Sequence, residues 1–269
     1  HNAVISAVNP SSVHIPITRA NGVTTVLTSA EGGMIQGYAA LIDLAGWTAE
    51  EMARNGRVAM VMTYPRVGGG GRRGFRGGGA PQGDAAETQN RAVTELITYL
   101  RDARAYNARP NPVAQNLPFA ALGPVLRGEV PVIFDVQTEG QIRGVLALAD
   151  SFKLKIVLRG ATESWMLADT LAARKIPVIV GPLTAVPDGE APYDAVYAYP
   201  GVLAKAGLNV VVLEAGQARN EADFMGYEML AYQQLFWRGG VNATADMNVS
   251  MLAASTLGGG PTVNWSNCL

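Results

Sequence analysis

The sequence predicts an α/β fold with mainly parallel strands, and two observations lead to this prediction. Buried β-branched runs such as 130–136 alternate with segments of helical periodicity such as 141–152. Strands that are separated by helices of one to three turns form parallel βα units. Right-handed crossovers then leave two arrangements open, a barrel or an open doubly wound sheet.

Composition excludes several classes of protein. The chain has 269 residues, of which 48% are hydrophobic and 16% are charged, so it is long and apolar enough to bury a core. The net charge of -1 favours no nucleic acid or anionic membrane as a partner. No apolar run approaches the roughly 18 residues that a membrane span needs. We therefore expect a soluble protein, and both the periplasm and the cytoplasm stay open.

The first elements follow from β-branched runs and helix caps. A strand is expected at 23–28, preceded by a short helix that Ser11 or Ser12 caps. Thr48 and Glu51 are spaced as a capping box, which predicts a helix that ends near 55–56. The buried run at 58–64 predicts a second strand.

Residues 67–83 are of low complexity and contain runs of glycine with Arg72, Arg73 and Arg76. Such a segment cannot bury apolar area, so we expect a mobile loop. An arginine-rich clamp or lid for an anion is the functional interpretation that stays open.

The rest of the chain alternates between the two periodicities. A long helix is expected at 84–108, and the further elements are strands at 130–136, 155–158, 177–180 and 209–213 and helices at 141–152, 163–174, 201–206 and 221–237. Ligands of parallel βα folds bind at the carboxyl ends of the strands. The candidate site residues at those ends are Ser29, Tyr64, Asp135, Gln137 and Arg159.

Several short motifs in the first 183 residues occur in one order along the chain. They are RANGVTTV at 19–26, GWT at 46–48, LRGEVPV at 126–132 and ALAD at 147–150. With them, residues 7–183 resemble the amidohydrolase superfamily, in its imidazolonepropionase-like branch. The resemblance implies a TIM-type (β/α)₈ barrel that hydrolyses amide or cyclic amide bonds with bound metal. About seven strands can be read instead of eight, so we expect a partial barrel whose open edge a homo-oligomer covers.

A second set of motifs lies near the end of the chain, with KAGLNVVVLEAG at 205–216 and GGG at 258–260. Residues 204–269 resemble the glucose-methanol-choline flavin oxidoreductases, near the long-chain alcohol oxidases. The resemblance implies that Glu214 holds the ribose of FAD and that Gly258, Gly259 and Gly260 approach the flavin. The Gly-x-Gly-x-x-Gly turn that should precede the acid is missing, so FAD binding is not expected.

The junction between the two resemblances lies near 200–209. It predicts an amidohydrolase-like partial barrel at 1–200 and an oxidoreductase-like segment at 201–269, packed on the first. Both ends read as ordinary sequence, and we expect both to be cut. A fusion, a misassembled gene or an engineered product would each produce this order.

The metal centre that the first resemblance implies needs four histidines, and the chain has His1 and His14 alone. We align Asp135 and Arg159 with strand-end positions where the family often has histidine, and arginine cannot ligate a metal. A conventional zinc site is therefore not expected. His1 and Asp135 stay as candidate ligands of a divalent metal.

The expected activity is hydrolysis of an amide or cyclic amide bond in a small-molecule substrate. Asp135 would act as the base or as an oxygen ligand, and Arg159 would hold a carboxylate or the developing oxyanion. Tyr64 is the third candidate for catalysis, and Ser29, Arg66 and Gln137 are the candidates for substrate binding. A catalytically impaired relative, a non-enzymatic scaffold or assembly protein, and a fragment of an FAD-dependent alcohol oxidoreductase are the alternatives.

Overall fold

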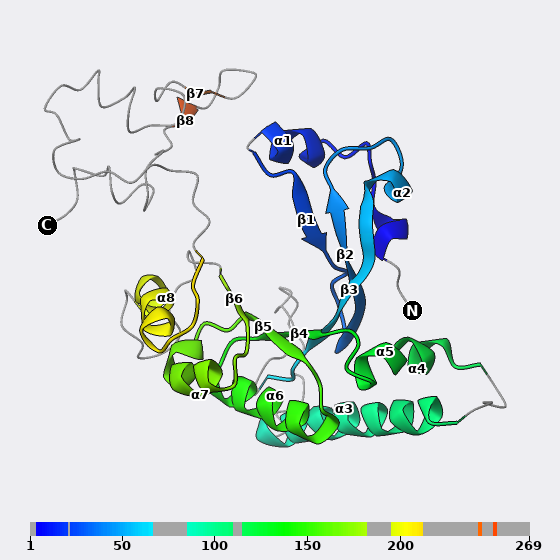
Figure 1. The fold of residues 1–269 in the computed structure, drawn as a ribbon, viewed down its shortest axis with the longest axis vertical. Helices are drawn as coiled ribbons and strands as arrows, with labels where there is room; N and C mark the ends of the chain where they lie inside the picture. The colour runs from blue at the N-terminus through cyan, green and yellow to red at the C-terminus, as the bar shows by residue number, and fades with distance from the viewer. Residues whose placement is uncertain are drawn as a thin grey trace, which may run out of the picture. The chain divides into compact units, whose positions relative to one another are not determined.

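The computed structural model describes residues 4–20, 22–66, 85–109, 115–181, 195–211, 242–243 and 250–251. The chain divides into two compact units, 1–209 and 210–269. In the first unit six strands form one sheet whose spatial order follows the chain, β1-β2-β3-β4-β5-β6 (Figure 1). In the second unit β7 (Asn242–Ala243) pairs antiparallel with β8 (Ser250–Met251).

The elements of the first unit have the following bounds. The strands are β1 (Thr25–Thr28), β2 (Ile35–Asp43), β3 (Ala53–Thr63), β4 (Val132–Val136), β5 (Ile156–Gly160) and β6 (Val178–Val180). The helices before β4 are η1 (Val4–Ala7), α1 (His14–Ala20), α2 (Ala49–Met52), α3 (Ala85–Asn107), α4 (Leu117–Ala121) and α5 (Gly123–Leu126). The helices after β4 are α6 (Glu139–Phe152), η2 (Ser164–Leu167), α7 (Ala168–Ala173) and α8 (Ala195–Lys205).

The sheet consists of an antiparallel part and a parallel part. Strands β1, β2 and β3 are antiparallel neighbours, whereas β3, β4, β5 and β6 are all parallel. Short connections return the chain antiparallel, and a parallel partner needs a crossover, which α3, α6 and α7 provide. The α/β prediction is confirmed. Within the described residues the sheet is a curled half-barrel of six strands and not a closed eight-stranded barrel.

Two local predictions are wrong near the antiparallel part. Strand β2 was not expected, because its buried residues Tyr38, Ala39 and Ala40 are consecutive and its register with β3 shifts at several points. Such shifts break the alternation by which a strand is recognised. The helix expected to end near 55–56 stops at Met52, because Ala53 already pairs with Ile42 in the sheet.

The later elements agree more closely with their predictions. Helix α6 begins at a capping box in which Thr138 and Gln141 exchange side-chain and backbone hydrogen bonds. The helix predicted at 163–174 is present as η2 followed by α7, and the helix predicted at 201–206 is the last part of a longer α8. Residues 209–211 form no strand. The predictions for 67–83, 212–213 and 221–237 lie outside the described residues.

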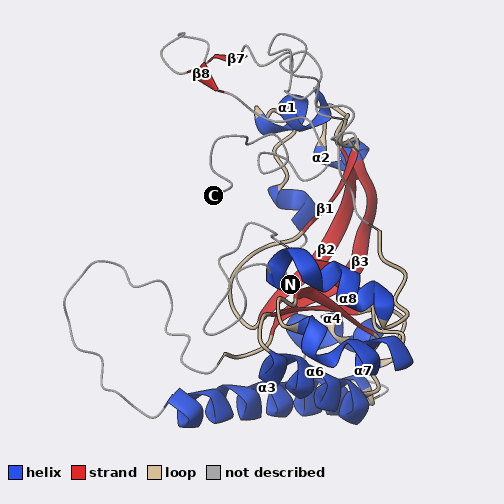
Figure 2. Ribbon diagram, turned by 90° about the vertical axis from the view of Figure 1, so that its left-hand side faces the viewer, coloured by secondary structure: helices blue, strands red, loops and turns tan. Residues whose placement is uncertain are grey.

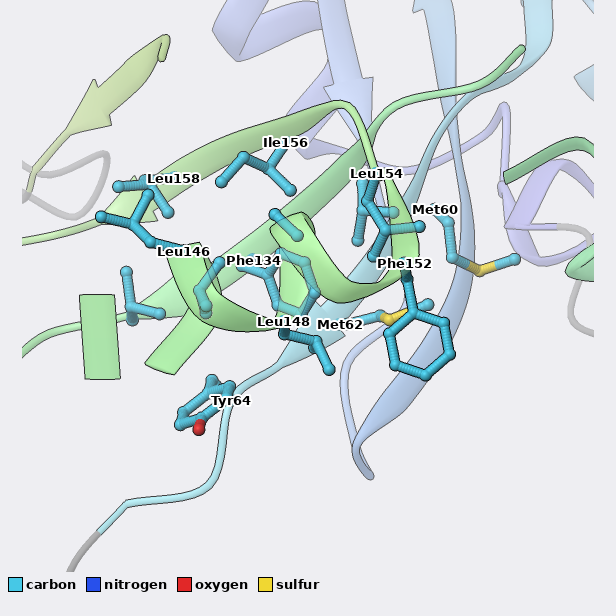
Figure 3. Packing of buried hydrophobic residues seen from close by; sticks show 14 of the residues in the cluster. Met60, Met62, Tyr64, Phe134, Leu146, Leu148, Phe152, Leu154, Ile156 and Leu158 are labelled. Atoms are coloured by element: carbon cyan, nitrogen blue, oxygen red, sulfur yellow. The ribbon is translucent and has the colours of Figure 1, made fainter. Parts of the chain in front are cut away.

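The main core lies on one face of the sheet, under α3, α6 and α7, as Figures 1 and 2 show. Figure 3 shows Phe134 and Leu158 from neighbouring strands packed with Leu146 and Phe152 of α6. Phe134 and Leu158 are fully buried. Burial of each large apolar side chain contributes about 1.5–3 kcal/mol, so this layer is what fixes the strands relative to the helices.

The opposite face, which we call the inner face, carries small apolar side chains. Ala39, Ala59, Val61 and Ile133 form a separate buried cluster there. Side chains alternate between the two faces along each strand, so residues two positions further on point the same way. The inner face therefore continues from apolar residues to the polar side chains at the carboxyl ends of the strands.

Among the helices of the described residues, none is long and apolar enough to cross a membrane.

Candidate functional site

Five polar side chains meet at the carboxyl end of the inner face, and we call them the strand-end cluster. They are Ser29, Gln36, Thr63, Asp135 and Arg159. Asp135 lies between Phe134 and Val136, which both belong to the helix-face core. Alternation along β4 therefore directs the Asp135 side chain to the inner face.

Asp135 and Arg159 occupy partnered positions on β4 and β5. The Arg159 Nε donates to Asp135 Oδ1 at 2.5 Å, and Nη2 donates to Oδ2 at 2.7 Å. The two side chains keep 32% and 24% of their surface exposed, so a ligand can reach both. This two-point pairing fixes the plane of the guanidinium as well as its position.

Two residues of the antiparallel part hold the carboxylate from the other side. The Gln36 Nε2 donates to Asp135 Oδ2 at 3.2 Å and to Thr63 Oγ1 at 2.8 Å. Gln36 is buried, and its Oε1 is buried without a hydrogen-bond partner. The parallel and antiparallel parts of the sheet are thus joined by one polar network at Asp135.

The electrostatics of the cluster keep Arg159 charged. The hydrogen bonds from Asp135 raise the pKa of the Arg159 guanidinium, and the charges of Asp135 and Glu31 act in the same direction. Burial lowers that pKa by less. Arg159 therefore carries a positive charge at every pH at which the protein is folded, so it acts as a fixed cation and not as an acid or base.

The cluster leaves donors free for a ligand. A guanidinium has five N–H groups. Arg159 uses one on each of its nitrogens, the third being a donation from Nη1 to Ser29 Oγ at 3.3 Å. Within the described residues, its remaining N–H groups have no protein acceptor. Carbonyl, carboxylate or oxyanion oxygens are the ligands that suit such donors.

The described part of the chain does not fit the metal centre that the amidohydrolase resemblance implies. It contains no group of three His, Cys, Asp or Glu side chains that could hold a metal ion. The Asp135 carboxylate already accepts three hydrogen bonds, two of them from a cation that a bound metal would repel. We therefore derive no chemical step through a metal.

The structure does not bring the other described candidates to the cluster. Tyr64 is buried on the helix face, where its ring lies against Gly144 of α6 (Figure 3), and burial raises the pKa of its phenol. Arg66 is exposed beyond β3. Gln137 accepts hydrogen bonds from Thr162 through its side-chain and backbone oxygens, at 3.4 and 3.2 Å.

The remaining predicted site residues lie outside the described residues. They are His1, Glu214, Gly258, Gly259 and Gly260. Their roles in metal or FAD binding stay predictions.

Sequence reasoning missed Gln36 and Thr63. Thr63 could have been found, because it is two positions beyond Val61 on a recognised strand and so shares its face. Gln36 lies on β2, whose shifted register hid the strand. No local signal indicates that its amide meets a carboxylate 99 residues further along the chain.

No protein-family model matches the chain. The crystal structure of an amidohydrolase from Thermotoga maritima MSB8 is similar, with a TM-score of 0.60 and 19% sequence identity. The match covers 78% of this chain and 55% of that one. The fold is like that of an amidohydrolase. At this identity the likeness concerns the fold alone, and the predicted resemblance is confirmed at that level.

Part of the chain is similar to long-chain-alcohol oxidases of Arabidopsis thaliana. FAO4A is 47% identical over 66 residues, FAO4B 45% over 64 residues and FAO3 41% over 68 residues. Each match covers about a quarter of this chain and 9% of the oxidase. The predicted resemblance of a segment to these oxidases is confirmed, and the chain spans only 9% of the length of these relatives.

Proposed function

We propose that the protein is an amidohydrolase-like hydrolase that acts on an amide or cyclic amide bond of a small molecule, with the strand-end cluster as its reaction centre. One observation carries the proposal. Asp135 and Arg159 form a two-point ion pair at the carboxyl ends of β4 and β5, in a sheet whose fold is like that of an amidohydrolase. That edge of a parallel βα sheet is where such folds gather their catalytic residues.

In this proposal Arg159 holds the oxygen of the scissile carbonyl. Its free N–H groups are charged, fixed by Asp135 and partly shielded from water, so they stabilise negative charge that develops on that oxygen. The Ser29 hydroxyl, which accepts from Arg159 Nη1, is placed to contact a second polar group of the substrate.

Asp135 acts as the base. Its Oδ2 accepts two hydrogen bonds, whereas its Oδ1 accepts one and keeps a lone pair for a water molecule. Asp135 takes a proton from this water as its oxygen forms a bond to the carbonyl carbon, and the carbonyl electrons move to the oxygen at Arg159. The carbon–nitrogen bond then breaks, and the nitrogen receives the proton from Asp135.

A substrate panel tests this proposal. The purified full chain is assayed by mass spectrometry against N-acyl amino acids and five- and six-membered cyclic amides. We expect hydrolysis of at least one class, with Asp135→Asn and Arg159→Lys each lowering kcat/KM by about 10²-fold or more, as for the loss of a base or an oxyanion donor. Circular dichroism shows whether each variant is folded.

The chain offers a matched control in a second ion pair. Arg174 of the α7 end pairs with Asp150 of α6 on the surface, away from the strand ends. Asp150→Asn and Arg174→Lys repeat the two substitutions and should leave kcat/KM within about twofold, because exposed pairs contribute little. Full activity of Asp135→Asn, or no hydrolysis by a folded wild-type chain across the panel, contradicts the proposal. The second result would favour a non-enzymatic scaffold.

A further inference from the structure

A cavity lies on the helix face of the sheet, between the β2–β3 hairpin and the α3 and α4 helices. Its volume is about 540 Å³, within the range of about 300–1,000 Å³ that small-molecule sites have. Its walls are mostly apolar and aromatic, and the larger wall residues are Met34, Ile35, Met60, Leu96, Tyr99 and Leu122. A space of this size and lining fits the apolar body of a small ligand.

The cavity is distinct from the strand-end cluster. Asp135, Arg159, Thr63 and Ser29 do not line it, and Met60, Leu96 and Leu122 of its wall belong to the core under the helices. Gln36 lines the cavity and also contacts Asp135, so it is the one described residue that the two places share.

One cation in the wall has no anionic partner. The Arg57 guanidinium lies 5.5 Å from the centre of the Tyr38 ring, and no described carboxylate lies within ion-pair distance of it. The Tyr38 ring is fixed because its hydroxyl donates to the Ala121 carbonyl at 2.6 Å. A cation over an aromatic face beside an apolar space is a suitable partner for a carboxylate.

Nearby charges do not already neutralise Arg57. Arg127 and Glu129, which both act on Tyr38, pair with each other at 2.6 Å. Glu95 of α3 lines the cavity too, but it forms no ion pair with Arg57. Removal of Glu95 should therefore strengthen the binding of an anion and weaken that of a cation.

We propose that this cavity is a second ligand site, which binds a small amphipathic carboxylate such as an aryl or alkyl acid. The apolar part lies between Met60, Leu96 and Leu122, and the carboxylate pairs with Arg57 over the Tyr38 ring. The site does not depend on hydrolysis at the strand-end cluster.

Calorimetric titration of the full chain with 4-phenylbutyrate and octanoate tests the proposal, with 4-phenylbutanamide as the uncharged probe. We expect saturable binding of the acids and about tenfold weaker binding of the amide, the loss typical of one charge-assisted hydrogen bond. Arg57→Gln should weaken the acids about tenfold and leave the amide unchanged, and Glu95→Gln should tighten the acids severalfold.

Arg54→Gln is the matched control, because Arg54 is on the same strand and pairs with Asp43 away from the cavity. It should change the affinity by less than about twofold. Ala121→Leu keeps every charge and places a larger side chain in the cavity wall, so it should abolish the binding of both acids. Equal affinities of Arg57→Gln and the wild type, unchanged binding by folded Ala121→Leu, or no saturable binding of either acid would each overturn the proposal.

Discussion

Asp135 on β4 and Arg159 on β5 are register partners, and their side chains meet in two parallel hydrogen bonds of 2.5 and 2.7 Å. The pair stands on a face that is otherwise lined by Ala39, Val61 and Ile133. Its surroundings on one side are therefore apolar, and on the other they open to a ligand. Asp135 is also tied to β2 through Gln36, so the pair joins the two parts of the sheet.

We predict that this pair contributes to stability as well as to activity. Asp135→Ala leaves a partly buried guanidinium without its partner and should lower the free energy of unfolding by about 1–3 kcal/mol. Asp150→Ala breaks the more exposed pair with Arg174 and should cost less than about 1 kcal/mol. Urea denaturation measures both. Equal losses would show that the inner-face pair gains nothing from its partial burial.

Gly144 should be irreplaceable by alanine. A Cβ atom at this position of α6 would overlap the hydroxyl and ring of Tyr64, which is itself buried. We expect Gly144→Ala to lower the free energy of unfolding by about 1–3 kcal/mol through overpacking. Gly140→Ala on the same helix meets no atom within 4 Å and should raise it by up to about 1 kcal/mol. Thermal melts of the two variants that shift in the same direction would contradict this packing.

Gln141 should be more important than a typical polar residue of a helix. It is buried, its Nε2 donates to the Tyr64 carbonyl at 2.9 Å, and its Oε1 accepts from the Gln137 backbone at 2.9 Å. Gln141→Leu leaves these backbone groups unpaired and should cost about 1–3 kcal/mol of unfolding free energy. Gln89→Leu, which removes one longer bond to the Pro65 carbonyl, should cost less than about 0.5 kcal/mol. Similar costs in urea denaturation would refute the distinction.

Stability should fall in alkaline solution. Burial raises the pKa values of Tyr38, Tyr64 and Tyr199, so these phenols lose their protons less readily in the folded than in the unfolded chain. Above a pH of about 10 the unfolded chain therefore binds fewer protons, and the free energy of unfolding decreases as the pH rises. Tyr64→Phe should reduce this slope between about pH 10 and 11. A slope in that range that Tyr64→Phe leaves unchanged would argue against the burial of its hydroxyl.

Zinc should not stabilise the protein through the strand-end cluster. Asp135 is committed to Arg159 and Gln36, and an arginine cannot ligate a metal. We expect stoichiometric Zn²⁺ to shift the Tm by less than about 1 °C, against several degrees for a structural site. A saturable rise in Tm that Asp135→Asn abolishes would show that Asp135 is a metal ligand after all.

The periodic elements could be predicted from the sequence, because their signals are local. The alternation of β-branched runs with helical stripes gives β4, α6 and β5 within a few residues, and the Thr138 and Gln141 spacing marks the start of α6. The same reasoning placed Asp135 and Arg159 at neighbouring strand ends, since parallel strands end at one edge of a sheet. The candidate residues on recognised inner-face positions were thus correctly brought together.

The sequence by itself determined which segments are strands and helices and which polar residues follow the strands. Only the tertiary structure decided on which face each of them lies, because facing depends on register and not on residue type. Tyr64 follows β3 as closely as Asp135 ends β4, yet it packs against Gly144 in the core. Gln36 reaches Asp135 because shifts of register in β2 turn its amide to the inner face, and pairing between strands so distant in the chain leaves no local signal.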